Sequence, residues 1–205
     1  MYIFVISRKF MNNAICRTDL KYKICVSGAA ETEAFGPEAL NMAEELGKEI
    51  VRHGAVLVEG ATTGFPHWAA KGAKEAGGIV VGISPASTES EHIKKYGLPT
   101  DYRDLIIYTG TGYPGRNLLL TRTADAIIIG CGRMGTINEF TIAFEDKKPI
   151  GILEGAWDTD EELKDIIEKS HRSEEMKDKI VFSKNPKELV EKVIELIKKE
   201  KEKNK

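Results

Sequence analysis

Residues 124–139 read Ala-Asp-Ala-Ile-Ile-Ile-Gly-Cys-Gly-Arg-Met-Gly-Thr-Ile-Asn-Glu, and this stretch decides the predicted fold. Its apolar run, residues 126–129, predicts a buried strand; a glycine-rich turn follows over residues 130–135, and a helix is expected to open at Thr136. Such a turn leaves backbone N–H groups free, and the helix dipole favours negative charge beside them. We therefore predict a phosphate cradle made of Gly132, Gly135 and Thr136.

Short apolar runs alternate with helical patterns along the rest of the chain. Strands are predicted at residues 23–26, 55–59, 79–83, 105–108, 126–129, 150–153 and 180–182. Helices are predicted at residues 37–52, 66–76, 115–123, 136–145, 160–169 and 186–199. The strands are apolar at consecutive positions, as strands buried on both faces are. The alternation predicts right-handed βαβ units and hence an α/β fold, a three-layer, doubly wound parallel sheet of Rossmann-like type.

The length and composition indicate one globular domain. The chain has 205 residues, of which 41% are hydrophobic and 30% charged. We expect a leader over residues 1–21, a single nucleotide-binding domain over residues 22–200 and a charged tail over residues 201–205. The leader is either an extra edge strand or sequence ahead of a start at Met11, and we assign it no function.

Several classes of function are disfavoured by composition. A net charge of −2 leaves no broad basic surface for a polyanion, so nucleic-acid binding is not expected. No run approaches the ~20 apolar residues of a membrane span. The histidines are scattered, and we predict no metal site. The cysteines, Cys16, Cys25 and Cys131, have no Cys-x-x-Cys spacing, and we expect reduced thiols in a cytoplasmic protein.

Ligands of doubly wound sheets bind beyond the carboxyl ends of the strands, so the turns after other strands matter too. After the first strand come Ser27, Gly28 and Ala29, small residues that let a phosphate or ribose approach the backbone. Tight packing of a turn explains these three equally well.

The turn after the second strand is longer than a helix cap requires. Its N–H and hydroxyl groups are therefore expected to contact a ligand rather than only to cap the next helix. The expected contacts are Gly60, Thr62, Thr63 and Gly64.

A glycine-rich loop after the fourth strand, including Gly112, is expected to deliver Arg116 to the start of a helix. The planar guanidinium suits phosphate or carboxylate recognition, whereas an exposed Arg in a first helical turn opposes the helix dipole. Arg133 adds charge to the phosphate cradle, and Glu139 either faces the crevice or caps its own helix. Cys131 lies where a thiolate is stabilised, although a small residue that fits the turn explains it better.

Over about residues 23–153 these motifs resemble the LOG (Lonely Guy) family, within the wider SLOG group of Rossmann-like nucleotide-binding proteins. Enzymatic LOG proteins carry Arg-Lys, then Ser-Asp-Ala, then Pro-Gly-Gly-x-Gly-Thr-x-x-Glu. Here Arg116-Asn117, Ala124-Asp-Ala126 and the run from Cys131 to Glu139 stand in the same register.

The resemblance implies a phosphoribohydrolase, which cleaves the N-glycosidic bond of a nucleoside 5′-monophosphate to a base and ribose 5-phosphate. It assigns the catalytic roles to Arg116 and Glu139, because an oxocarbenium-like centre needs a carboxylate to steady its charge and to position water. It also implies a homodimer or higher homo-oligomer that requires no cofactor.

The departures from the LOG pattern favour a second hypothesis about the function. Asn117 replaces the Lys, and Cys131-Gly-Arg133 replaces Pro-Gly-Gly. This pattern is similar to a branch of the group that holds uncharacterised proteins and a molybdenum-cofactor carrier. The chain is thus expected to be either a hydrolase or a non-catalytic carrier for a nucleotide-like cofactor such as molybdenum cofactor, with a bound nucleotide monophosphate or molybdopterin-type ligand. Whether it is an enzyme stays open.

Overall fold

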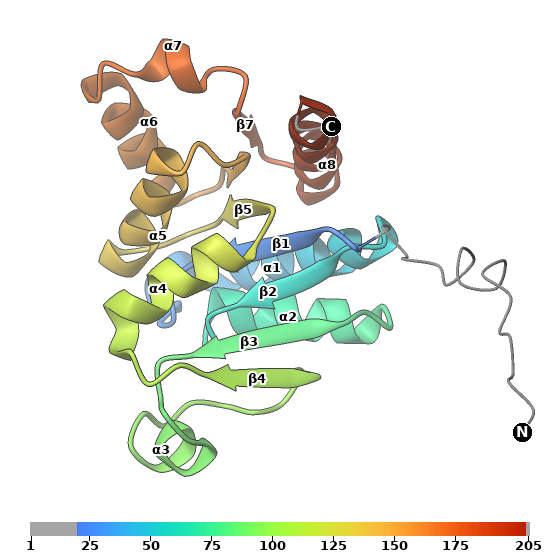
Figure 1. Cartoon of the computed structure of the whole chain (residues 1–205), viewed down its shortest axis with the longest axis vertical. Coiled ribbons are helices and arrows are strands. Elements are labelled where there is room, and N and C mark those ends of the chain that lie inside the picture. Colours follow the sequence, from blue (N-terminus) through green and yellow to red (C-terminus); the bar gives the residue numbers. More distant parts are fainter. Residues whose placement is uncertain (1–19, 204–205) are drawn as a thin grey trace, which may run out of the picture.

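Within residues 20–203, the part of the chain that the computed structural model describes, seven strands form one parallel sheet (Figure 1). The strands are β1 (Lys23–Ser27), β2 (Val56–Glu59), β3 (Val80–Ser84), β4 (Leu105–Tyr108), β5 (Ala126–Ile129), β6 (Ile150–Leu153) and β7 (Ile180–Ser183). Their spatial order is β4-β3-β2-β1-β5-β6-β7. The predicted doubly wound α/β fold is confirmed. The expected leader lies, up to residue 19, outside the described residues, as do residues 204–205 of the expected tail.

Helices connect the strands. They are α1 (Gly36–Arg52), α2 (Phe65–Glu75), α3 (Glu89–Lys94), α4 (Gly112–Thr123), α5 (Met134–Glu145), α6 (Thr159–Lys169), α7 (Ser173–Met176) and α8 (Pro186–Lys203), with a short 3-10 helix, η2 (Glu33–Phe35), before α1. The sequence pattern does not predict α3, α7 or η2, because each is too short to carry a recognisable 3.6-residue period.

Two helices, α4 and α5, begin two or three residues earlier than predicted. α4 starts at Gly112 instead of residue 115, so its glycines and Pro114 form the first turn rather than a loop. Proline is tolerated there because the first N–H groups of a helix have no partner within the helix. α5 starts at Met134 instead of Thr136. α8 continues to Lys203, so it includes residues expected to belong to the charged tail.

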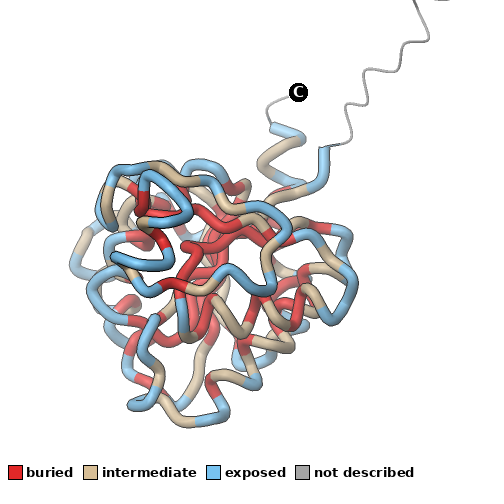
Figure 2. The backbone as a smooth tube through the Cα atoms, turned by 90° about the horizontal axis from the view of Figure 1, so that it is seen from below, coloured by how far each residue is buried: buried red, intermediate tan, exposed pale blue. Residues whose placement is uncertain are grey.

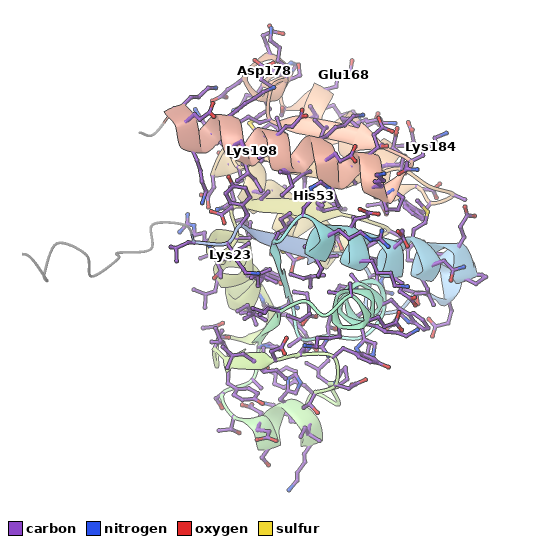
Figure 3. The ribbon with its side chains drawn as sticks, turned by 90° about the vertical axis from the view of Figure 1, so that its right-hand side faces the viewer. Lys23, His53, Glu168, Asp178, Lys184 and Lys198 are labelled. Carbon is purple, nitrogen blue, oxygen red and sulfur yellow. The ribbon has the colours of Figure 1, made fainter. Side chains whose placement is uncertain are left out.

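The helices cover the sheet in two layers. α1, α2 and α8 pack on one face, around a core that includes Leu46, Phe65 and Val193. Figure 3 views this side, where α8 and α1 lie next to each other. α4, α5 and α6 cover the other face around Leu120, Phe140 and similar residues. Buried residues accordingly concentrate in the interior, between exposed outer surfaces (Figure 2).

The strand order reverses at β1, which has β2 on one side and β5 on the other. Doubly wound sheets bind ligands at this kind of switch point. Two glycines after these strands admit the ring of Phe65 beneath the crevice: a Cβ atom would lie 2.7 Å from it at Gly28 and 2.2 Å from it at Gly130. These two turns are therefore packed against an aromatic ring. Every helix among residues 20–203 is too short or too polar to cross a lipid bilayer.

Candidate functional site

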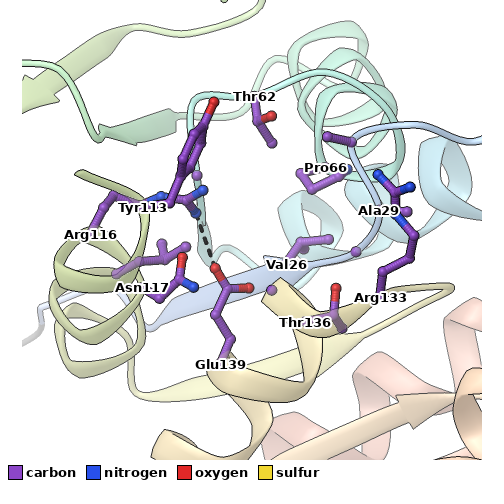
Figure 4. A pocket seen from close by; sticks show the side chains of 15 residues that line it. Val26, Ala29, Thr62, Pro66, Tyr113, Arg116, Asn117, Arg133, Thr136 and Glu139 are labelled. Carbon is purple, nitrogen blue, oxygen red and sulfur yellow. Dashed lines mark hydrogen bonds and ion pairs between the residues drawn. The ribbon is translucent and has the colours of Figure 1, made fainter. Parts of the chain in front are cut away.

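A pocket of about 220 Å³ opens at the switch point, beside the N-terminal parts of α4 and α5 (Figure 4). Sites that enclose a drug-sized ligand usually measure ~300–1,000 Å³, so this pocket would enclose only part of a nucleotide-sized molecule. The predicted site residues that line it are Gly28, Ala29, Gly60, Thr62, Arg116, Arg133, Gly135, Thr136 and Glu139. Turns that follow β1, β2 and β5 thus meet at one place, together with α4.

A buried ion pair occupies the middle of this pocket. Arg116 Nη1 donates to Glu139 Oε1 over 3.0 Å, and both side chains are more than nine-tenths buried. Arg116 lies in the second turn of α4 and is not the exposed first-turn residue that the sequence left as an alternative. Gly60 makes room for it, since a Cβ atom at that position would lie 2.0 Å from Nη1. The glycine after β2 is therefore required by the arginine from α4.

The Glu139 carboxylate is held from three sides. The hydroxyl of Ser27 donates to Oε2. With its amide nitrogen toward the carboxylate, Asn117 donates to Oε1 over 2.9 Å and to the Tyr113 carbonyl over 3.1 Å. Burial raises the pKa of Glu139 above its usual range, opposed by Arg116 and Ser27, which favour the charged form. Glu139 therefore faces the crevice and does not cap its own helix.

The first turn of α5 forms one end of the pocket. A Cβ atom at Gly135 would meet nothing within 4 Å, so this glycine leaves open space. Thr136 follows it, 3% exposed and lining the pocket. Arg133 stands at the rim, where Nη2 pairs with Glu31 over 3.0 Å and both side chains are largely exposed. The backbone N–H groups of this turn, the Thr136 hydroxyl and the long cationic side chain of Arg133 are suited to binding an anion.

The remaining predicted contact residues do not line the pocket. Ser27 acts through Glu139, as described. Thr63 is exposed and donates its hydroxyl to the Ala30 carbonyl over 2.9 Å. Gly64, at φ +70°, lies against the same backbone. Gly112 is the half-buried first residue of α4.

Gly132, which the glycine pattern predicts as part of the phosphate cradle, does not line this pocket. Its N–H donates to Thr159 Oγ1 over 2.8 Å, and the Thr159 hydroxyl returns a bond to the Gly132 carbonyl over 3.1 Å. Its backbone is therefore committed to the α6 N-terminus. A Cβ atom at Gly132 would lie 2.4 Å from the Thr136 side chain, so the glycine is needed for packing.

Several pocket residues are not among the predicted contacts. They are Val26, Ala30, Pro66, Tyr113, Asn117 and Leu120. In the sequence, Asn117 stood out only as the residue after Arg116, and Tyr113 stood out only as an aromatic residue within a glycine-rich segment. Reading residues 112–117 as a helix would have placed Tyr113, Arg116 and Asn117 on neighbouring turns.

A second buried ion pair shapes the turn after β2. Arg103 Nε donates to Glu59 Oε1 over 2.8 Å, and neither side chain is exposed. Arg103 Nη2 also donates to the Thr62 carbonyl over 2.8 Å. Because Glu59 is paired in this way, it holds the turn around Gly60 and Thr62 in place.

The described cysteines are not suited to chemistry. Burial raises the pKa of Cys131 to about 12, and Cys25 is also buried with a raised pKa. Both are therefore thiols at neutral pH, and Cys131 fits its turn as a small residue. Cys16 lies outside the described residues.

Within residues 20–203, no group of three or more His, Cys, Asp or Glu side chains is placed to hold a metal ion.

Comparison with known proteins adds to this geometry. The model of the SLOG cluster4 family matches residues 21–190. An uncharacterised protein of Archaeoglobus fulgidus is 35% identical over 131 residues, which cover 64% of this chain and 79% of that protein.

Two solved structures of similar proteins cover most of the chain. The molybdenum cofactor binding protein of Rippkaea orientalis is 27% identical with a TM-score of 0.68, over 89% of this chain and 98% of that chain. The molybdenum cofactor carrier protein of Chlamydomonas reinhardtii is 29% identical with a TM-score of 0.68, over 87% of this chain and 99% of that chain.

Proposed function

We propose, from the premise that this chain belongs to the SLOG cluster4 family, that it binds and carries a phosphate-bearing, nucleotide-like ligand, with molybdenum cofactor as the favoured cargo. The observation that carries this proposal is the single pocket in which the open first turn of α5 adjoins the buried Arg116–Glu139 pair. The similarity to a molybdenum cofactor carrier over nearly all of that protein's length supports the choice of cargo.

The phosphate is assigned to the first turn of α5. Gly135 lets an anion approach the backbone, Thr136 offers a hydroxyl, and Arg133 supplies positive charge at the rim. A phosphate bound there would be stabilised by the helix dipole as well as by these donors. The pocket then holds the phosphate end of the ligand and leaves the rest near its mouth.

Carriage without catalysis is favoured by the state of Glu139. The residue is 5% exposed, and Ser27, Arg116 and Asn117 already contact its oxygens. A carboxylate engaged in this way is a strong structural element and a poorly accessible base. The free thiols of Cys25 and Cys131 agree with a cytoplasmic location.

A LOG-type phosphoribohydrolase is the second candidate, because Glu139 has a raised pKa beside Arg116 in the same pocket. In that reaction the bond between ribose C1′ and the base nitrogen breaks, and its electron pair leaves with the base. Glu139 steadies the positive charge on the sugar and accepts a proton from the attacking water, whose oxygen becomes the new hydroxyl on C1′. The departing base takes up a proton.

Release of free base from a panel of nucleoside 5′-monophosphates separates the two candidates, run beside Glu139→Gln and beside titration with molybdenum cofactor. The carrier proposal predicts cofactor binding without base release by the wild-type chain. Base release that disappears in Glu139→Gln would instead establish the hydrolase. A chain that neither binds the cofactor nor any monophosphate would refute the proposed site.

A further inference from the structure

We infer that Tyr113 is the stacking platform for the planar heteroaromatic ring, purine or pterin, of the phosphate-bearing ligand. This inference rests on the proposed function, because it assigns the ring end of a ligand whose phosphate end lies at α5. Tyr113 is 45% exposed and lines the pocket. A tyrosine this exposed is not a core residue, whereas Leu120 of the same helix is buried in the core.

Two neighbours hold the ring of Tyr113 in place, while much of the residue stays exposed. Its neighbours in the first turn of α4 include Gly112 and Gly115, which have no side chains to cover the ring. Tyr96 contacts it edge-on, with ring centroids 5.5 Å apart and an interplanar angle of 83°. The Arg116 guanidinium carbon lies 5.7 Å from the ring centroid. A T-shaped aromatic contact and a cation over the ring thus hold Tyr113 in place; neither is a parallel aromatic stack, and the residue remains 45% exposed.

The position of Tyr113 relative to the phosphate end matches the order of groups in a nucleotide. In Figure 4, Tyr113 lies above and to the left of the Glu139 carboxylate, and Thr136 lies to its right. A ligand with its phosphate at Thr136 would therefore place its middle part over Glu139 and its ring beside Tyr113. Asn117 connects these parts, since its amide donates to both the Tyr113 carbonyl and Glu139.

The test compares a ligand that has a ring with one that lacks it. Adenosine 5′-monophosphate and ribose 5-phosphate are titrated calorimetrically into the wild-type chain, Tyr113→Leu and Tyr113→Phe. Tyr113→Leu is expected to weaken binding of the monophosphate by roughly 5- to 150-fold, the range for one base–aromatic stack, and to leave ribose 5-phosphate within about twofold. Tyr113→Phe keeps the stack and is expected to bind both as the wild type does.

Tyr102→Leu is the matched control, because Tyr102 is an exposed tyrosine that does not line the pocket. It is expected to leave both affinities unchanged. A phosphorylated pterin, 6-hydroxymethylpterin phosphate, is the third ligand: a greater dependence on Tyr113 for it than for the monophosphate assigns a pterin, and the reverse assigns a purine.

Two results would overturn the inference while leaving the proposed function intact. One is an unchanged monophosphate affinity in Tyr113→Leu. The other is an equal loss for the monophosphate and for ribose 5-phosphate, which would assign Tyr113 to the shape of the pocket and not to the ring. If the wild-type chain binds none of the three ligands and does not bind molybdenum cofactor either, the proposed function itself fails.

Discussion

At the scale of single residues, the pocket is organised around one buried carboxylate. Glu139 lies among Arg116, Ser27 and Asn117, and burial raises its pKa more than the first two lower it. A buried ion pair is often no more stable than an apolar replacement, although removing one partner from it is costly. The arrangement is thus better explained by a site that holds charged groups in fixed positions than by stability.

The raised pKa of Glu139 predicts a pH dependence of stability. A carboxyl whose pKa is higher in the folded chain contributes stability that is fully present below its unfolded pKa of ~4.3 and is lost as pH rises through the raised value. Glutamine at this position does not titrate. The free energy of unfolding of the wild type, minus that of Glu139→Gln, is therefore expected to fall as pH rises from about 4.

Urea denaturation of both chains across this range measures the difference directly, with Glu145→Gln as a control at an exposed position of the same helix. A difference that grows with pH would mean that Arg116 and Ser27 outweigh burial, and that the pKa of Glu139 is lowered.

The sequence pointed to Arg116 and Glu139 but not to the other side chains that contact the carboxylate. Arg116 and Glu139 were identified from a glycine turn and a family resemblance, and they form an ion pair. Ser27 was predicted as a ligand contact, but its hydroxyl bonds Glu139. No local pattern reveals that bond, because the two residues are 112 positions apart and meet only through the pairing of β1 with β5.

At the scale of elements, the glycines that follow the strands have different tasks. A Cβ atom at Gly60 would lie 2.0 Å from Arg116, whereas one at Gly135 would meet nothing within 4 Å. The first glycine is required by the protein itself. The second leaves space that the free protein does not use, which is expected where a ligand approaches the backbone.

These contacts predict opposite effects of two similar substitutions. Gly60→Ala is expected to cost about 1–3 kcal/mol of stability, because the new methyl group displaces the Arg116 guanidinium. Gly135→Ala is expected to leave stability unchanged or to raise it by up to ~1 kcal/mol, since alanine is the better residue within a helix. Chemical denaturation of both variants is the measurement, and equal destabilisation would contradict the assignment of open space to Gly135.

The strands were predicted to within one residue at either end, because consecutive apolar positions flanked by turns are typical of a buried parallel sheet. The start of α4 was not predicted as closely, because the composition of Gly112, Pro114 and Gly115 is typical of a loop. This segment is helical because of its packing. α4 contacts α5, and Arg116 donates a hydrogen bond to Glu139. Tertiary contacts of this kind outweigh local propensity.

At the scale of the whole molecule, one side of the sheet is incompletely covered. The register pairs Leu105 with Val81 and Ile107 with Ile83, so these β4 side chains point to the face that α4 covers elsewhere. Both are exposed, by 55% and 44%. The exposed residues of α4 itself include Leu118 and Leu119. Apolar surface of this kind on an edge strand and a helix indicates an interaction site.

We expect this surface to contribute to a homo-oligomer, most simply a twofold dimer. Light scattering is expected to give at least twice the 22.7 kDa mass of one chain, and Leu119→Glu is expected to shift the population toward the single chain. Lys169→Glu, an exposed change on α6, is the control and should leave the mass as it is. A wild-type chain that scatters only as a 22.7 kDa species would exclude this assembly.

The central claim is that the first turn of α5 binds the phosphate of a nucleotide-like ligand, and calorimetric titration with adenosine 5′-monophosphate tests it most directly. Thr136→Val, which removes the pocket hydroxyl, is compared with Thr141→Val, which removes an exposed hydroxyl of the same helix. Thr136→Val is expected to lose ~1.5–3 kcal/mol in binding free energy, the value of a hydrogen bond to a charged group, and Thr141→Val is expected to lose none. Equal affinity of both variants and the wild type would contradict this claim.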